Sequence, residues 1–169
     1  MDRKKEIHLT PVENRALENS SFGSLYGPLE KIPTLTVDNF PALGRLAAMR
    51  FIEWVQANPE GVVSLPTGKT PEHFIRWINH ALANWDEATV RAELEKYGVD
   101  PGNKPQMHGL HFVQIDEFYP IDSGQQNSFF SYVSRFYLEG FGLDPDRAML
   151  IDCNRIGLSR DQTLAGLWP

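Results

Sequence analysis

The residues best suited to chemistry lie in a loop that follows a short apolar run. Residues 61–70 read G-V-V-S-L-P-T-G-K-T, and Pro71 comes next. The turn carries a flexible glycine, a cation and two hydroxyl groups, and the proline is suited to open a helix. A strand, a tight loop and a helix N-terminus together bind phosphate through backbone N–H groups and the helix dipole. The sequence therefore predicts a phosphate site at this turn.

Two other interpretations of the loop stay open. Gly68, Lys69 and Thr70 match the end of the nucleotide-binding P-loop, G-x-x-x-x-G-K-[ST]. Val63 stands where that pattern needs its first glycine, which lets the backbone wrap closely round the phosphates, so a nucleotide triphosphatase is disfavoured. Turns of this composition are also common between a strand and a helix, with no ligand involved.

A second candidate site is the acidic pair Asp116 and Glu117, which follows the apolar run 110–115. Such a pair is often only a solvated loop edge. At the end of a buried strand, however, a carboxylate is held rigidly enough to abstract a proton next to a carbonyl group. Parallel α/β sheets bind ligands beyond the carboxyl ends of their strands. We therefore expect the loop and the acidic pair at the same edge of a sheet.

Apolar runs alternate with helical stripes along the chain, and this order predicts a mostly parallel α/β sheet. The expected strands are residues 32–37, 61–65, 110–115 and 148–152, and the unbroken apolar run 61–65 predicts a strand buried on both faces. The expected helices are residues 40–57, capped by Asp38 or Asn39, then 71–85, capped by Thr70, then 86–97, 127–138 and the beginning of one at 159–167. The stripe of the first helix is predicted to be Leu43, Leu46, Ala47, Phe51, Trp54 and Val55.

Composition limits the classes of protein. The chain has 169 residues, which suits one domain, and 41% of them are hydrophobic, enough for a core. A net charge of −6 argues against a nucleic-acid partner. The one cysteine, Cys153, excludes an internal disulfide and indicates a reducing, cytoplasmic setting. We expect no secretory signal, no membrane span and no metal site, since His108 and His111 would face opposite ways in a strand.

Three segments in order resemble the glucosamine-6-phosphate deaminase/isomerase family, whose broader set includes the 6-phosphogluconolactonases. They are L-P-T-G-K-T-P at residues 65–71, I-D-E-F at 115–118 and N-S-F-F-S-Y at 127–132. The family's own segments read L-P-T-G-G-T-P, M-D-E-Y and Ser-Tyr-x-Ser-Phe. The resemblance covers residues 32–154, and the D-E-F form is closer to the deaminases than to the lactonases, which typically carry G-D-E-R.

The resemblance implies a parallel Rossmann-like three-layer sheet of the deaminase, ribose-phosphate isomerase and CoA-transferase type. It implies that Thr67, Gly68 and Thr70 hold the phosphate of a sugar. Asp116 would be the base that moves a proton between C2 and C1 of an open-chain amino-sugar phosphate, with Glu117 in a supporting role. No cofactor is implied.

The assignment of Ser128 near the site is weaker. Lys69 replaces the family's second glycine, where it could add a cation or crowd the phosphate. Phe118 replaces the usual tyrosine and removes a hydroxyl.

The family's G-x-G-x-D-G-H-I-A-F segment, with further catalytic residues, has no counterpart in the chain. We therefore expect the N-terminal part of a longer domain at residues 32–169, preceded by an irregular extension at residues 1–31 that is a mobile tail or an arm on a partner subunit. Alone, this part would be inactive and would form homo-oligomers through uncovered surfaces. The alternatives are a non-catalytic sugar-phosphate-binding regulatory domain and a 6-phosphogluconolactonase-like hydrolase.

Overall fold

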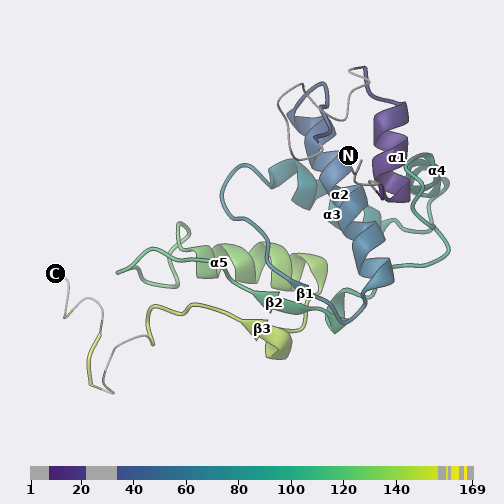
Figure 1. The fold of residues 1–169 in the computed structure, drawn as a ribbon. Coiled ribbons are helices and arrows are strands. Elements are labelled where there is room, and N and C mark those ends of the chain that lie inside the picture. The colour runs from purple at the N-terminus through teal and green to yellow at the C-terminus, as the bar shows by residue number, and fades with distance from the viewer. Residues whose placement is uncertain (1–7, 22–33, 156–158, 160, 164–165, 167–169) are drawn as a thin grey trace, which may run out of the picture.

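The fold is built on a small parallel sheet. The computed structural model describes residues 8–21, 34–155, 159, 161–163 and 166 (Figure 1). Its strands are β1 (Val62–Val63), β2 (His111–Val113) and β3 (Ala148–Met149), in the order β1-β2-β3. All pairs are parallel, with Val63 opposite Phe112 and Phe112 opposite Ala148. The predicted parallel α/β sheet is confirmed, and each of these strands is shorter than expected.

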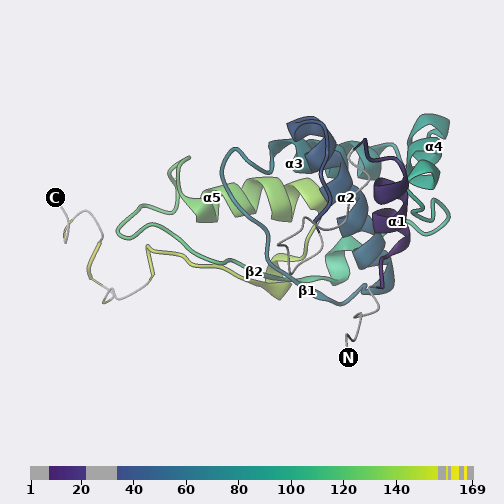
Figure 2. The same cartoon turned by 45° about the horizontal axis from the view of Figure 1, so that its top comes forward.

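The helices gather on one side of this sheet, as two views of the ribbon show (Figures 1 and 2). They are α1 (Pro11–Glu18), α2 (Phe40–Ala57), α3 (Glu72–Ala83), α4 (Ala88–Lys96) and α5 (Phe129–Val133). A π-helical segment, η2 (Ser134–Glu139), continues α5, and two short 3₁₀ turns are η1 (Met107–Gly109) and η3 (Pro145–Arg147). None of these helices is long and apolar enough to cross a membrane.

The two faces of the sheet differ in what covers them. Val63 and Phe112 are buried against the helices, whereas Val62 and Met149 are 65% and 71% exposed. Side chains alternate between the faces of a strand, so the second pair lies on the opposite face. The prediction that residues 61–65 are buried on both faces is therefore wrong for the described chain, because the α-helices that the structure describes cover only one face.

Helix α2 begins where expected. The side chain of Asn39 accepts a hydrogen bond from the N–H of Ala42 at 2.9 Å, and a proline occupies the first turn. The predicted apolar stripe is partly wrong, because Leu43 and Ala47 are exposed. Helix α2 packs along α3, and its buried residues are Gly44, Leu46, Ala48, Met49, Ile52 and Val55.

Gly44 shows how close this packing is. A Cβ atom at that position would lie 2.5 Å from the Cβ of His73 and 2.8 Å from the backbone nitrogen of Phe74. Only a glycine lets the backbones of α2 and α3 approach this closely.

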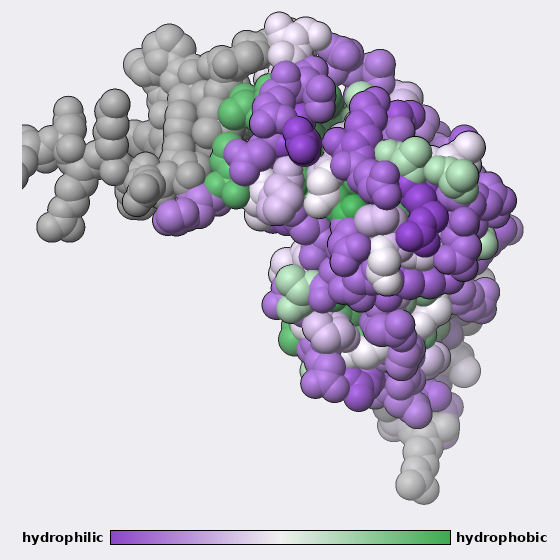
Figure 3. Space-filling model, turned by 90° about the vertical axis from the view of Figure 1, so that its right-hand side faces the viewer, coloured by the Kyte–Doolittle hydropathy of each residue, from purple (hydrophilic) through white to green (hydrophobic). Residues whose placement is uncertain are grey.

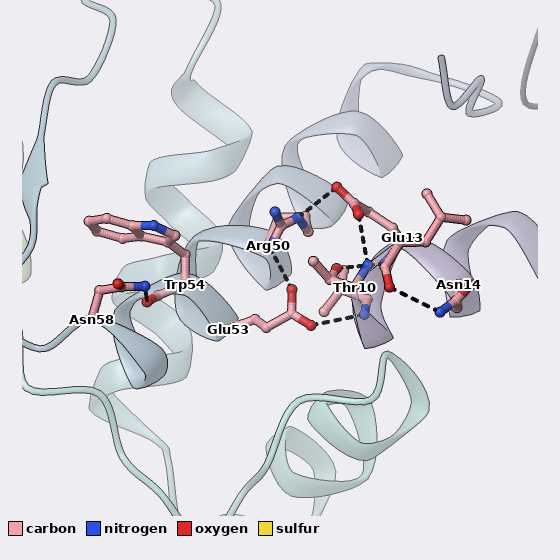
Figure 4. A network of polar contacts seen from close by, with 9 residues as sticks. Thr10, Glu13, Asn14, Arg50, Glu53, Trp54 and Asn58 are labelled. Carbon is pink, nitrogen blue, oxygen red and sulfur yellow. Dashed lines mark hydrogen bonds and ion pairs between the residues drawn. The ribbon is translucent and has the colours of Figure 1, made fainter. Parts of the chain in front are cut away.

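Helix α1 corrects the expectation of an irregular extension at residues 1–31. The Thr10 hydroxyl and the Glu13 carboxylate cap each other's backbone N–H groups, which starts the helix. Val12 is fully buried in the core. The Arg50 guanidinium of α2 bonds to Glu13 at 3.1 Å and to Glu53 at 2.6 Å (Figure 4). Residues 11–18 are thus an integral part of the packed unit.

Some of the remaining expectations about strands and helix ends are confirmed and others are wrong. The strand expected at residues 32–37 is not formed at residues 34–37, and residues 32–33 and most of 159–167 lie outside the described residues. Helix α4 lies within the helix expected at residues 86–97 and buries Val90 and Leu94. Gly140, which follows the helix expected at residues 127–138, keeps a right-handed backbone, and Gly142 just beyond it is left-handed. Seen from the side of α1 and α4, the surface is largely hydrophilic (Figure 3).

Candidate functional site

The carboxyl ends of the three strands are tied together by two polar side chains. The Ser64 hydroxyl, just after β1, donates to the carbonyl of Val113 at the end of β2 at 2.6 Å. Buried Gln114 donates to the carbonyl of Asp116 at 2.9 Å and accepts from the N–H of Ile151, beyond β3, at 3.0 Å. The loop after β1 and the acidic pair after β2 therefore start from one fixed edge, as the sequence predicted.

Two tyrosine hydroxyls hold the loop in place. Tyr132, on α5, donates to the carbonyl of Gly68 at 2.8 Å. Tyr137, on η2, donates to the carbonyl of Pro66. Both tyrosines lie within the helix expected at residues 127–138, and no role was predicted for their hydroxyls. The signal available was their hydroxyls, since a buried tyrosine usually finds a hydrogen-bond partner.

The start of α3 differs from the prediction that Thr70 caps this helix. The cap position is Pro71, without a side-chain hydrogen bond, and the helix begins at Glu72. Thr70 stays exposed beside Gly68 and Lys69, while Thr67 is half-buried. Among the described residues, no acceptor takes the backbone N–H groups of residues 67–70. These N–H groups are thus free for a ligand.

The Glu117 carboxylate binds the N-terminus of α5. Its carboxylate accepts hydrogen bonds from the Ser128 hydroxyl at 2.7 Å, from the N–H of Phe129 at 2.9 Å and from that of Phe130 at 2.7 Å. It also accepts from the N–H of Phe118. Partial burial raises the pKa of Glu117, but these four bonds together outweigh it and hold the pKa below its ordinary value.

Ser128 is fully buried and completes the same junction. Its hydroxyl caps α5 by accepting from the N–H of Ser131 at 3.3 Å while donating to Glu117. The structure thus brings Glu117 and Ser128 together, and both position α5.

Asp116, unlike Glu117, has a carboxylate without hydrogen-bond partners in the part of the chain that the structure describes. It is exposed, and it makes no ion pair with those described residues either. No hydrogen bond or ion pair in that part of the chain joins Asp116 directly to Thr67, Gly68, Lys69 or Thr70. The link is indirect, because the helix that holds Gly68 is itself anchored by the residue next to Asp116. The roles of these residues in phosphate binding and proton transfer stay predictions.

Comparison with known proteins finds similarity at the level of the fold. No protein-family model matches the sequence, and no curated protein matches it. A solved monomeric glucosamine-6-phosphate deaminase, described as the missing link of the NagB superfamily, matches 70% of this chain with a TM-score of 0.54 and 19% sequence identity. The matched part spans 42% of that enzyme. At this identity the likeness shows the fold alone, and the chain therefore has a Rossmann-like α/β fold similar to that of this enzyme, with a sheet that is open in the described residues.

Proposed function

We propose that the chain binds a sugar phosphate at residues 66–70 and is glucosamine-6-phosphate deaminase/isomerase-like. The observation that carries this proposal is the hydrogen bond from Tyr132 to the Gly68 carbonyl. Through it, the helix anchored by Glu117 also supports the loop. Helix α5 thus connects the acidic pair to the proposed phosphate site. The likeness in fold to a glucosamine-6-phosphate deaminase is in line with this proposal.

In this proposal the free N–H groups of residues 67–70 and the Lys69 ammonium bind the phosphate group. The Asp116 carboxylate takes the proton from C2 of the open-chain amino sugar. The electron pair left on C2 forms a C1–C2 double bond while the electrons of the C1=O π bond move to O1, which takes a proton from water. Asp116 then returns its proton to C1, and the nitrogen lone pair closes onto C2, which leaves a protonated imine at C2. Water then displaces ammonia from that imine and gives the ketose phosphate. Glu117 takes no proton, because its carboxylate is occupied by its four donors.

A non-catalytic sugar-phosphate-binding regulatory domain is the second candidate. It is favoured by the exposure of Asp116, since a general base works best when neighbouring groups hold it against the carbon acid. In both candidates the single, buried Cys153 suits a reducing, cytoplasmic setting.

Calorimetric titration with glucosamine 6-phosphate, combined with assays for ammonia and ketose formation, separates these candidates. In the natural full-length protein, the deaminase proposal expects binding and turnover, with turnover reduced at least about 100-fold in Asp116→Asn, the usual scale of a lost general base. Asp86→Asn, at an exposed residue remote from the loop, is the matched control. Binding without turnover supports the regulatory domain. Hydrolysis of 6-phosphogluconolactone would identify a lactonase instead, and a protein that neither binds glucosamine 6-phosphate nor hydrolyses the lactone rejects all three.

A further inference from the structure

The two tyrosine hydrogen bonds act on alternate peptide groups of the loop. Tyr137 holds the carbonyl of Pro66, and Tyr132 holds the carbonyl of Gly68. In a planar trans peptide the C=O and the following N–H point in opposite directions. Fixing these carbonyls toward the helix therefore turns the N–H groups of Thr67 and Lys69 away from it, toward the open side of the loop.

The π-helical segment brings both tyrosines to the loop. They are five residues apart, which in a regular α-helix would separate their directions by about 140°. Tyr132 lies in α5 and Tyr137 in η2, whose wider i→i+5 turns reduce this separation. The centroids of the two rings lie 6.0 Å apart. Such π-helical segments are rare and occur frequently at functional sites.

Both hydroxyls remain protonated donors at neutral pH. Burial, with a smaller effect from the Glu72 carboxylate, raises the pKa of Tyr132. Burial, with a smaller effect from Tyr132, raises the pKa of Tyr137 well above its usual range. The rings are fixed by aromatic neighbours, with the centroid of Phe136 at 4.6 Å from that of Tyr132 and the centroid of Phe141 at 5.3 Å from that of Tyr137. A phenylalanine at either position keeps this packing and removes only the hydroxyl.

We propose that Tyr132 and Tyr137 are positioning residues that aim the N–H groups of Lys69 and Thr67, respectively, at the phosphate of the ligand. This inference rests on the proposed sugar-phosphate site and adds how that site is held in shape. Neither tyrosine touches the ligand. Each acts through one carbonyl, so each controls one N–H group.

The test uses ¹H–¹⁵N spectra of the chain during titration with inorganic phosphate and, separately, with glucosamine 6-phosphate. In the wild type we expect the N–H signals of Thr67 and Lys69 to move. Tyr132→Phe should weaken phosphate binding about tenfold and reduce the Lys69 movement more than that of Thr67, and Tyr137→Phe should do the reverse. Tyr97→Phe, on the far side of the molecule at the end of α4, is the matched control and should bind like the wild type.

The opposite effects expected of the two tyrosine variants distinguish positioning from a general loss of structure. A loosened fold would reduce the movements of the Thr67 and Lys69 N–H signals alike. If Tyr137→Phe does not fold, Tyr132→Phe alone decides the question, since Tyr132 is only half-buried. Wild-type affinity in the folded tyrosine variants, or equal loss of both signals, overturns the positioning role and leaves the proposed function standing. Failure of the wild type to bind either phosphate overturns both.

Discussion

The Ser128 hydroxyl donates a hydrogen bond to the Glu117 carboxylate at 2.7 Å, which joins the end of the acidic pair to the first turn of α5. Two backbone N–H groups of that turn bind the same carboxylate. Glu117 therefore acts as an anchor for the helix that supports the phosphate loop, and Asp116 alone of the pair has no such partner among the described residues.

Replacing Glu117 by glutamine should lower the free energy of unfolding by about 1–3 kcal/mol at pH 7, because charge-assisted hydrogen bonds to several donors are weakened. The pKa of Glu117 is lower in the folded than in the unfolded chain, so its stabilisation is present above the unfolded pKa and is lost as the pH falls through the folded pKa. Urea unfolding of both proteins between pH 7 and pH 3 should show the difference shrinking at the acid end. A difference independent of pH would contradict the anchor role.

Gly68 and Gly142 offer a matched pair for testing the loop. Both have left-handed backbones, with φ of +88° and +73°, and a Cβ atom at either position would meet no atom within 4 Å. Alanine at each should therefore cost about 1–2 kcal/mol of stability, from backbone strain alone. Only Gly68→Ala should also weaken the binding of glucosamine 6-phosphate, as measured by calorimetry. Equal affinities in the two variants would argue against phosphate binding at this loop.

Val12 tests whether α1 belongs to the packed unit. Its side chain is fully buried in the core. Val12→Ala should therefore lower the free energy of unfolding by about 2 kcal/mol through the cavity left behind. Arg15→Ala removes only an exposed ion pair with Glu18. Loss of such a surface pair should change stability by only about 0.5 kcal/mol or less. Thermal and urea unfolding compare the stability of the two variants. Similar losses of stability in both would show that residues 11–18 do not belong to the packed unit.

The open face of the sheet is the surface that we propose for self-association. Val62, Ile115 and Met149 are 65%, 65% and 71% exposed, although they are apolar residues in or just beyond the strands. We expect concentration-dependent dimers in sedimentation experiments, and Val62→Lys or Met149→Lys should weaken them at least about tenfold, because a lysine would have to be desolvated. Thr89→Lys on the hydrophilic side of α4 is the control with the same charge change. A monomeric wild type would contradict this proposal.

The order of elements could be predicted from the sequence because apolar runs and helical stripes alternate clearly. Helix α1 could also have been found, since T-P-V-E at residues 10–13 has the pattern of a capping box. The faces of the elements were harder to predict. Both rows of α2 are apolar, and the close approach of α3 at Gly44 decides which row is buried.

The candidate site was predictable in its position and less so in its support. Asp116 and residues 66–70 follow neighbouring strands, and that alone places them at one edge. The roles of Gln114 and Tyr137 depend on partners 37 and 71 residues away, which no local pattern records. The expected cap at Thr70 is wrong, because Pro71 occupies the cap position and the helix begins at Glu72.

The loop is already fastened by its two carbonyls before any ligand arrives. A ligand that binds there need not freeze a mobile backbone, so little conformational entropy is lost on association. Its affinity would then follow from the contacts it gains and would appear mainly as slow dissociation. Loss of either tyrosine hydrogen bond would make the loop backbone more mobile in the free protein. Binding would then cost more conformational entropy, and the residence time of the bound phosphate would be shorter.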